Sequence, residues 1–384
     1  MPDSTTLSKS ELSALKMKLN ALGTATSSKV KSSDKTKVIP ELGVIFFSGL
    51  SPDQQPYDLI LKVAKFIDEN GFTAIWTPER HFTEVGGAYP NPSVLTAALA
   101  TITKNVRLRA GSINLPLHDP LRVAEEWAVV DNLSGGRVDL GLAPGWHVRD
   151  FVLKPENFAG KFDILNEYRQ QLAALWEGKT ILKTDANGGS QEITTYPRPV
   201  QNKLPVWLTT SQKEDAWRFA GEQGLNVLTA LINFGPKELE KRIKIYREAR
   251  AGSGLDPAGG TVSLMLHTFV DRSNDIAIEK VRPPLTEYLR SFVDQHQTAN
   301  NKKDNKVRAI SEVGTDSDDF VDMVFSRYIN TSSLIGSPER ATTILKDFKT
   351  MGVDEVACLV DFGINSNDVL NSLQLLSSLI REHK

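Results

Sequence analysis

Short β-branched and apolar runs alternate with longer segments of helical periodicity along most of this chain. The runs lie at residues 43–47, 74–77, 107–115, 138–143, 206–209, 227–230, 262–270 and 356–360. Amphipathic segments follow them at residues 57–70, 93–103, 121–133, 161–176, 213–223, 236–251, 273–288 and 367–382. This alternation is typical of parallel βα units. Eight such pairs in one α/β chain predict a single closed (β/α)8 TIM-type barrel over residues 41–384 rather than an open sheet.

Two connections are too long for plain loops. The first, residues 178–204, contains Asn187-Gly188-Gly189 and predicts a hairpin after the fourth strand. The second, residues 283–335, follows the seventh strand and has a polar centre at 298–319. Segments of this kind are typical of a mobile lid or of disorder. We expect a lid, because the insertion leaves the C-terminal end of a barrel strand, where barrel enzymes place their chemistry.

The first 40 residues differ from the rest. They are rich in Ser, Thr and Lys, and leucines spaced along residues 7–22 predict one short amphipathic helix. We therefore expect residues 1–40 to form a mobile N-terminal helix and linker.

Charge and composition narrow the function. The chain has 45 Lys and Arg against 47 Asp and Glu, so no strong field favours nucleic acid, and no apolar stretch predicts a membrane span or a secretion signal. We expect a cytoplasmic protein with a small-molecule substrate. The single cysteine, Cys358, lies in an apolar run and predicts a buried thiol.

Ionisable and aromatic residues follow the second and fourth strands. Glu79, Arg80 and His81 follow the second, where a barrel active site would lie, although a solvated loop would have the same composition. Trp146 and His147 follow the fourth and combine a stacking surface with a proton-transferring imidazole. The alternative for His147 is a packed side chain.

Small and hydroxyl residues follow the third and fifth strands. Gly111, Ser112 and Asn114 would let a flat ring approach the backbone, and tight packing explains them equally. Thr210 and Ser211 precede a helix and predict a phosphate seat, whereas Ser211 with Glu214 also fits a capping box. The histidines have no metal-ligand spacing, and there is no phosphate-loop or nucleophile-elbow motif.

Several of these segments together resemble the bacterial-luciferase-like flavin-dependent monooxygenases. The resemblance is carried by residues 72–142, including Trp76, Glu79 and residues 81–84, and by Gly336-Ser337-Pro338-Glu339. Residues 78–82, 117–127 and 145–147 are similar to the branch of the family found in polyketide and nonribosomal-peptide biosynthesis, and residues 7–22 resemble helical linkers of those assembly lines.

The resemblance implies a cofactor and partners. Reduced FMN would be a cosubstrate supplied by a flavin reductase, and one oxygen atom of O2 would enter an acyl or aminoacyl substrate held on a carrier protein. A homodimer is a further expectation. We expect the catalytic residues to be Glu79, Arg80, His81 and His147, and of these Glu79 and His81 match positions of the family. The flavin would contact Gly111 and Ser112, joined by a cis peptide, together with Asn114, Trp146, Thr210 and Ser211.

Two positions depart from the family pattern. Arg80 stands where luciferase has a catalytic histidine, and Pro144 stands where the family has a phosphate-binding arginine, so Arg149 or Arg122 would have to supply that charge. These departures leave two alternatives open. One is a deazaflavin-dependent hydride-transfer oxidoreductase, and the other is a non-catalytic flavin-binding protein.

Overall fold

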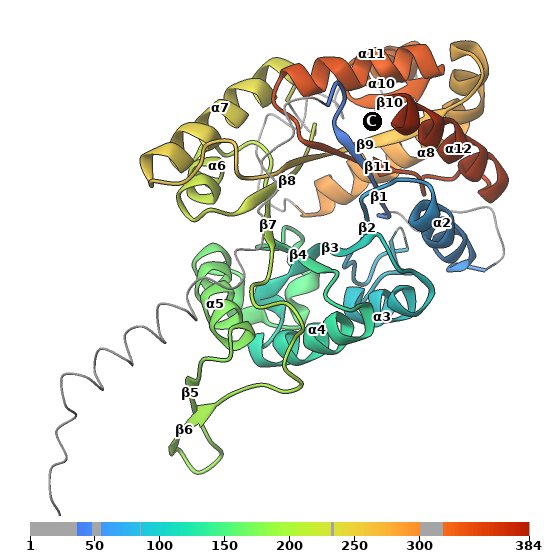
Figure 1. The fold of residues 1–384 in the computed structure, drawn as a ribbon. Coiled ribbons are helices and arrows are strands. Elements are labelled where there is room, and N and C mark those ends of the chain that lie inside the picture. The colour runs from blue at the N-terminus through green and yellow to red at the C-terminus, as the bar shows by residue number, and fades with distance from the viewer. Residues whose placement is uncertain (1–36, 48–54, 85, 232–233, 300–317, 384) are drawn as a thin grey trace, which may run out of the picture. The chain divides into compact units, whose positions relative to one another are not determined.

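The predicted strands form a closed parallel barrel in the computed structural model, which describes residues 37–47, 55–84, 86–231, 234–299 and 318–383 (Figure 1). The ring runs in the order β1-β2-β3-β4-β7-β8-β9-β11, and pairing of β11 with β1 closes it. Its strands are β1 (Glu41–Ile45), β2 (Ala74–Thr77), β3 (Arg107–Asn114), β4 (Val138–Ala143), β7 (Val206–Thr209), β8 (Asn226–Ala230), β9 (Val262–Val270) and β11 (Glu355–Leu359). The predicted fold is confirmed.

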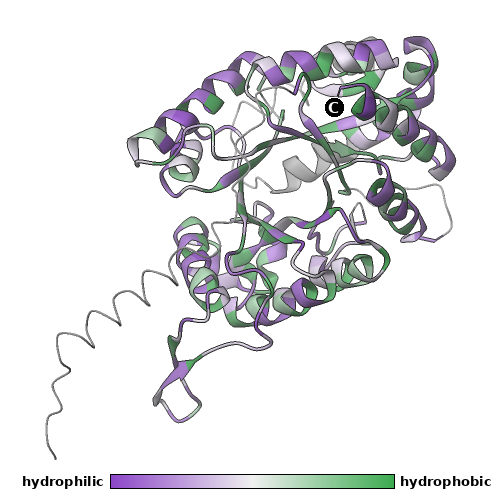
Figure 2. Cartoon of the chain, viewed as in Figure 1, coloured by the Kyte–Doolittle hydropathy of each residue, from purple (hydrophilic) through white to green (hydrophobic). Residues whose placement is uncertain are grey.

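Helices surround the ring, and in Figure 2 they alternate between hydrophilic and hydrophobic residues. Those that follow the ring strands are α2 (Asp58–Glu69), α3 (Pro92–Ile102), α4 (Pro120–Ser134), α5 (Lys161–Trp176), α6 (Glu214–Glu222), α7 (Pro236–Gly252), α8 (Asn274–Ala299) and α12 (Ser366–Glu382). Local sequence fixes several of their ends. Asn91 and Asp119 cap α3 and α4, each just before a proline, and Gly135 ends α4 in the left-handed conformation with φ 68°.

A buried ion network fills the N-terminal end of the barrel. Arg109 Nε lies 2.7 Å from Asp139 Oδ2, and Arg109 Nη1 lies 2.6 Å from Glu355 Oε2. Burial alone would lower the pKa of Arg109, but the two carboxylates outweigh it and raise that pKa. The guanidinium also lies 4.4 Å from the Trp207 ring centroid. This packing leaves the C-terminal end of the strands as the mouth of the barrel.

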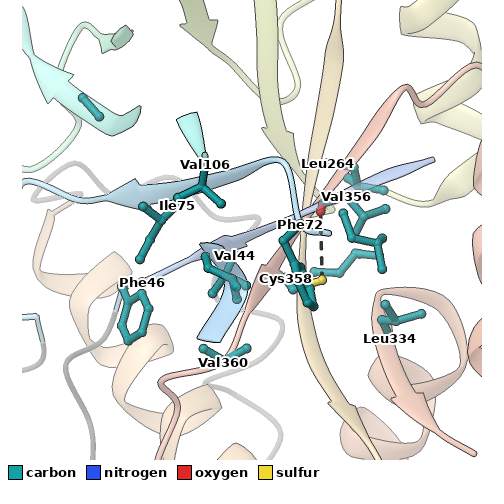
Figure 3. Close-up of a cluster of buried hydrophobic side chains, with 14 of the residues drawn as sticks. Val44, Phe46, Phe72, Ile75, Val106, Leu264, Leu334, Val356, Cys358 and Val360 are labelled. Carbon is teal, nitrogen blue, oxygen red and sulfur yellow. Dashed lines mark hydrogen bonds between the residues drawn. The ribbon is translucent and has the colours of Figure 1, made fainter. Parts of the chain in front are cut away.

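Apolar side chains fill the space between the barrel and its helices. Figure 3 shows part of this core, where Val44, Phe72 and Cys358 lie close together. Cys358 is fully buried, and burial raises the pKa of its thiol to about 12. The predicted buried position of the single cysteine is therefore confirmed.

The chain between β9 and β11 differs from the prediction. Helix α8 was expected to end at residue 288, yet it continues to Ala299, with Pro283 and Pro284 inside it. Burial of Val281 and Leu285 on one side of the helix supports it across the prolines. Three further elements had no clear sequence signal, namely α10 (Asp318–Thr331), β10 (Ser333–Gly336) and α11 (Pro338–Thr350).

The short strand β10 lies outside the ring. It pairs with the C-terminal part of β9 alone, with Ser333 beside His267 and Gly336 beside Val270. Four residues are too few to give a distinct pattern of burial, which explains why it was missed.

The first insertion is the predicted hairpin. Strands β5 (Ile181–Thr184) and β6 (Ser190–Ile193) pair antiparallel, and the Asp185 carboxylate accepts hydrogen bonds from the backbone N–H groups of Asn187 and Gly189 in the turn. The predicted N-terminal helix and most of the predicted lid at 298–319 lie outside the described residues. None of the helices in the described ranges is long and apolar enough to cross a bilayer.

Candidate active site

A buried carboxylate organises the exit of β2. Glu79 Oε1 accepts hydrogen bonds from His81 Nε2 at 2.8 Å and from His118 Nε2 at 2.7 Å, while Oε2 accepts from the backbone N–H of Asn114 at 2.8 Å. Burial disfavours the charged carboxylate, but the two histidines and the amide outweigh it and lower the pKa of Glu79 to about 2. The carboxylate is therefore ionised and holds both imidazoles in place.

The partnership with His118 was not predicted from the sequence. His118 ends the short 3-10 turn η1 (Leu115–Leu117) after β3. Burial opposes protonation of His118, but the Glu79 carboxylate outweighs it and raises the His118 pKa. The only sequence signal was the position of His118 just after the predicted third strand, beside a carboxylate from the second.

Arg80 lies inside the mouth rather than in solvent. Its guanidinium carbon lies 4.5 Å from the centroid of the Phe47 ring, and the side chain is buried. Burial lowers the pKa of Arg80, and electrostatic interactions with Tyr288, Asp150 and Asp361 oppose that shift. Arg80 therefore brings a positive charge next to several acidic groups at the C-terminal ends of the strands.

The exit of β3 carries the small residues that were predicted to face a ring. The Gly111–Ser112 peptide is cis, as predicted. A Cβ atom at Gly111 would lie 3.0 Å from Trp76 Cβ, so a larger residue would not fit there without movement. The Thr209 hydroxyl at the end of β7 donates to the Ser112 hydroxyl at 2.9 Å. The ends of β3 and β7 are thus joined by a hydrogen bond at the mouth.

Beyond β4 the chain turns at Trp146 and His147. Buried His147 caps the 3-10 helix η2 (Val148–Val152), where its Nδ1 accepts from the backbone N–H of Arg149 at 3.3 Å. Accepting at Nδ1 places the proton of a neutral imidazole on Nε2. The Trp146 ring is 38% exposed and meets His147 edge-on, with centroids 5.3 Å apart.

Asp150 connects the exits of β2 and β4. Its Oδ1 atom lies 3.9 Å from His147 Nδ1. Burial raises the pKa of Asp150, and the negative charge of Glu79 raises it further. Electrostatic interactions with His147, His81 and Arg80 oppose this rise. The predicted residues Glu79, Arg80, His81 and His147 therefore share one electrostatic environment. Asp150 was not predicted as a site residue. Its position three residues after His147 on a short helix could have indicated it, because residues at this spacing lie on the same face of a helix.

The turn after β7 differs from the capping-box alternative. Helix α6 begins at Glu214 with Lys213 at its N-cap, and no side chain caps it. The Ser211 carbonyl accepts from Trp217 Nε1 at 2.8 Å, and the Gln212 carbonyl accepts twice from the buried Arg242 guanidinium at 3.0 and 2.9 Å. Carbonyls thus anchor the turn, while the exposed Ser211 hydroxyl makes no hydrogen bond within the described part of the chain.

Two lysines lie close to this turn. Burial lowers the pKa of Lys161 at the start of α5, and the nearby charge of Lys213 lowers it further. The Lys161 ammonium also lies 4.5 Å from the Phe158 ring centroid. By contrast, Arg122 is engaged on the outer surface of α4, 3.3 Å from Glu125 and 3.1 Å from Glu126. The two lysines fit an anion better than Arg122 does.

Comparison with known proteins identifies the family. The model of the luciferase-like monooxygenase family matches residues 41–355. The chain belongs to this family. It is thus a luciferase-like, flavin-dependent monooxygenase.

The chain is similar to several members and to solved barrels. It is 26% identical to the oxygenase component of flavin-dependent trigonelline monooxygenase from Acinetobacter baylyi, over 83% of this chain and 87% of that protein. The structure of the oxygenating constituent of 3,6-diketocamphane monooxygenase from Pseudomonas putida, in complex with FMN, superposes with a TM-score of 0.70 at 19% identity, covering 89% and 98% of the two chains. An F420-dependent secondary alcohol dehydrogenase superposes with a TM-score of 0.68 at 17% identity, covering 90% and 99%.

Proposed function

We propose that the chain binds reduced FMN at the barrel mouth and inserts one oxygen atom of O2 into an organic substrate. The observation that carries this proposal is the position of Asp150, whose Oδ1 lies 3.9 Å from His147 Nδ1 and whose pKa is also affected by Glu79, Arg80 and His81. The exits of β2 and β4 therefore form one polar site next to the small residues of β3. That arrangement supports a ring-binding site with proton-transferring groups along its edge.

The phosphate of FMN would bind at the turn after β7. Thr210 and Ser211 offer hydroxyl groups there, and Lys161 with Lys213 offers positive charge. The mutual repulsion of the two ammonium groups would be relieved by an anion between them. In this assignment the two lysines, rather than Arg122, supply the positive charge for the phosphate. They take the role of the family arginine, whose position is occupied by Pro144 in this chain.

The isoalloxazine ring would lie along the Gly111–Ser112 edge of β3, near Asn114 and Trp146. Reduced flavin supplies the two electrons that activate O2. His147 is set to donate a proton or hydrogen bond from Nε2, and Glu79 keeps His81 oriented with its Nε2 proton directed to the carboxylate. Burial of these groups excludes water from the reacting edge, which favours transfer of oxygen to substrate over loss as peroxide.

A flavin reductase is the first proposed partner. The similar trigonelline enzyme is named as an oxygenase component, which supports a separate protein that supplies reduced flavin. For the substrate we propose an acyl or aminoacyl group on a carrier protein of natural-product biosynthesis, with a cytoplasmic enzyme that forms a homodimer. The basis is the resemblance of residues 7–22 and 145–147 described above. Deleting residues 1–38 should then reduce activity on the carrier-bound substrate and leave activity on a small thioester unchanged.

Hydride transfer with F420 is the competing function, because an F420-dependent enzyme shares the fold. The two functions are separated by titrating the protein, without oxygen, with reduced FMN and with reduced F420. Labelled dioxygen is then admitted to each complex with a panel of acyl and aminoacyl thioesters. We expect saturable binding of reduced FMN and a product heavier by one labelled oxygen atom. Preferential binding of reduced F420, with hydride transfer that reduces the substrate and no oxygen incorporation, would overturn the proposal.

A further inference from the structure

An imidazole on the wall of the barrel opposite the proposed flavin edge has a polar atom without a partner in the described part of the chain. His267 lies on β9, and its Nε2 atom is buried and makes no hydrogen bond with any residue that the structure describes. In the closed ring β9 is four strands away from β3 in either direction. The Gly111–Ser112 edge of β3 and His267 therefore face each other across the barrel.

The strand pattern directs His267 into the barrel. Ser263 accepts a hydrogen bond from Trp207 Nε1 at 3.1 Å, and Met265 packs against the cluster inside the ring that contains Trp76 and Trp207. Side chains two residues apart on a strand lie on the same face, so His267 continues this inner row toward the C-terminal end of β9. It follows that His267 lies in the upper layer of the barrel interior.

Tyr328 of α10 fixes the tautomer of His267. The Tyr328 hydroxyl lies 2.5 Å from His267 Nδ1 and has no other hydrogen-bond partner among the residues that the structure describes. Burial raises the pKa of Tyr328, which keeps the phenol protonated. The phenol therefore donates to Nδ1, and the proton of the neutral imidazole is on Nε2. The unpartnered atom is a hydrogen-bond donor.

The surroundings define what this donor can bind. Aromatic rings enclose His267, with centroids 4.5 Å away at Tyr288 and 5.1 Å away at Phe362. Burial lowers the pKa of His267 to about 3, so the ring stays neutral. Burial raises the pKa of Tyr288, and the nearby charge of Arg80 acts in the opposite direction. Because Tyr288 is close enough to Arg80 to be affected, the aromatic rings around His267 lie beside the active site. A neutral donor among aromatic rings favours an uncharged acceptor over a carboxylate or phosphate.

We propose that His267 Nε2 anchors the substrate by donating a hydrogen bond to a neutral carbonyl oxygen, with the substrate held between β9 and the flavin on β3. This inference rests on the proposed function. A buried N–H group without an acceptor is costly, and a substrate carbonyl would remove that cost on binding. Tyr328 is a positioning residue in this scheme, because it acts on the substrate only through His267.

Three small ligands of similar shape test the assignment. Cyclohexanone has the neutral acceptor, methylenecyclohexane lacks it, and cyclohexanecarboxylate carries a charge. Dissociation constants for the full-length protein should be about fivefold lower for cyclohexanone than for methylenecyclohexane, the factor that corresponds to one net hydrogen bond. Cyclohexanecarboxylate should bind more weakly than cyclohexanone.

Variants show whether the difference in affinity comes from the His267 hydrogen bond or from the shape of the pocket. In His267→Phe the difference between cyclohexanone and methylenecyclohexane should disappear, in His267→Gln it should persist in part, and in Tyr328→Phe it should shrink. His383→Phe, at the end of α12, is the matched control and should preserve the full difference. Circular dichroism of each variant shows that it is folded.

Failure of the His267 inference can be distinguished from failure of the proposed function. Binding of reduced FMN is measured separately by the titration without oxygen described above, and its absence in the wild type would contradict the proposed function without altering the comparison of the ligands. Equal affinities for cyclohexanone and methylenecyclohexane, or no binding of cyclohexanone, would overturn the role of His267. A difference that survives in His267→Phe would also overturn it.

Discussion

Replacing Glu79 by Gln should destabilise the protein by an amount that depends on pH. The structure lowers the pKa of Glu79 from 4.5 to about 2. At about 1.4 kcal/mol per pKa unit, this shift corresponds to about 3 kcal/mol of stability near neutral pH. The glutamine amide removes the charge and presents N–H groups to surrounding donors, so we expect the free energy of unfolding to fall by about 2 to 4 kcal/mol.

The sign of the pH dependence follows from the two shifted groups. Because the folded-state pKa of Glu79 is depressed, its contribution is present above pH 4.5 and is lost as the pH falls toward 2. The folded-state pKa of His118 is raised, so its contribution is complete below pH 6.5 and is lost as the pH rises through that raised value. The difference between wild type and Glu79→Gln should therefore be largest between about pH 4.5 and 6.5.

Urea unfolding at a series of pH values, followed by tryptophan fluorescence, measures this difference. Glu84→Gln is the matched control, because Glu84 is an exposed carboxylate in the same loop. Its effect should stay within about 0.5 kcal/mol at every pH. A loss in Glu79→Gln that is small, or that stays constant across the pH range, would refute the account of Glu79 as an ionised anchor for two histidines.

Three further changes test other parts of the structure. Ser211→Ala should weaken FMN binding about tenfold, because it removes one charge-assisted hydrogen bond. It should change the unfolding free energy by less than about 0.5 kcal/mol. Loss of stability with unchanged FMN affinity would mean that Ser211 has only a structural role. His147→Ala should reduce product formed per flavin oxidised more than it reduces flavin affinity, and equal losses would make His147 a cofactor-positioning residue. Arg109→Met should lower the unfolding free energy by about 3 to 5 kcal/mol, because it leaves buried carboxylates unpaired, and a smaller loss in denaturant titrations would contradict the ion network.

The ring of strands was predictable because each strand combines β-branched residues with a polar or glycine-containing turn. The run at 262–270 illustrates this, since it coincides with β9. Strand β10 was not predictable, because its partner on β9 is far away in sequence and the pairing is short. The end of α8 was not predictable, because the helix continues past residue 288 into the segment that was expected to form the insertion.

The candidate site was predictable only where a residue type was distinctive at the end of a strand. Glu79, His81 and His147 met that condition. The partners that give them their charge states, His118 and Asp150, come from other turns, and only the folded chain brings them together. His267 gave no signal at all, because a histidine inside an apolar strand looks like any packed residue until its neighbour Tyr328 is known.

The most direct test of the central claim is a crystal structure of the full-length protein with FMN bound. We predict that the phosphate binds at the turn after β7, within hydrogen-bonding distance of Ser211 and with Lys161 and Lys213 beside it. We also predict the isoalloxazine ring against the Gly111–Ser112 edge, with one edge toward His147. Flavin bound elsewhere on the barrel, or with its phosphate away from both lysines, would contradict the account.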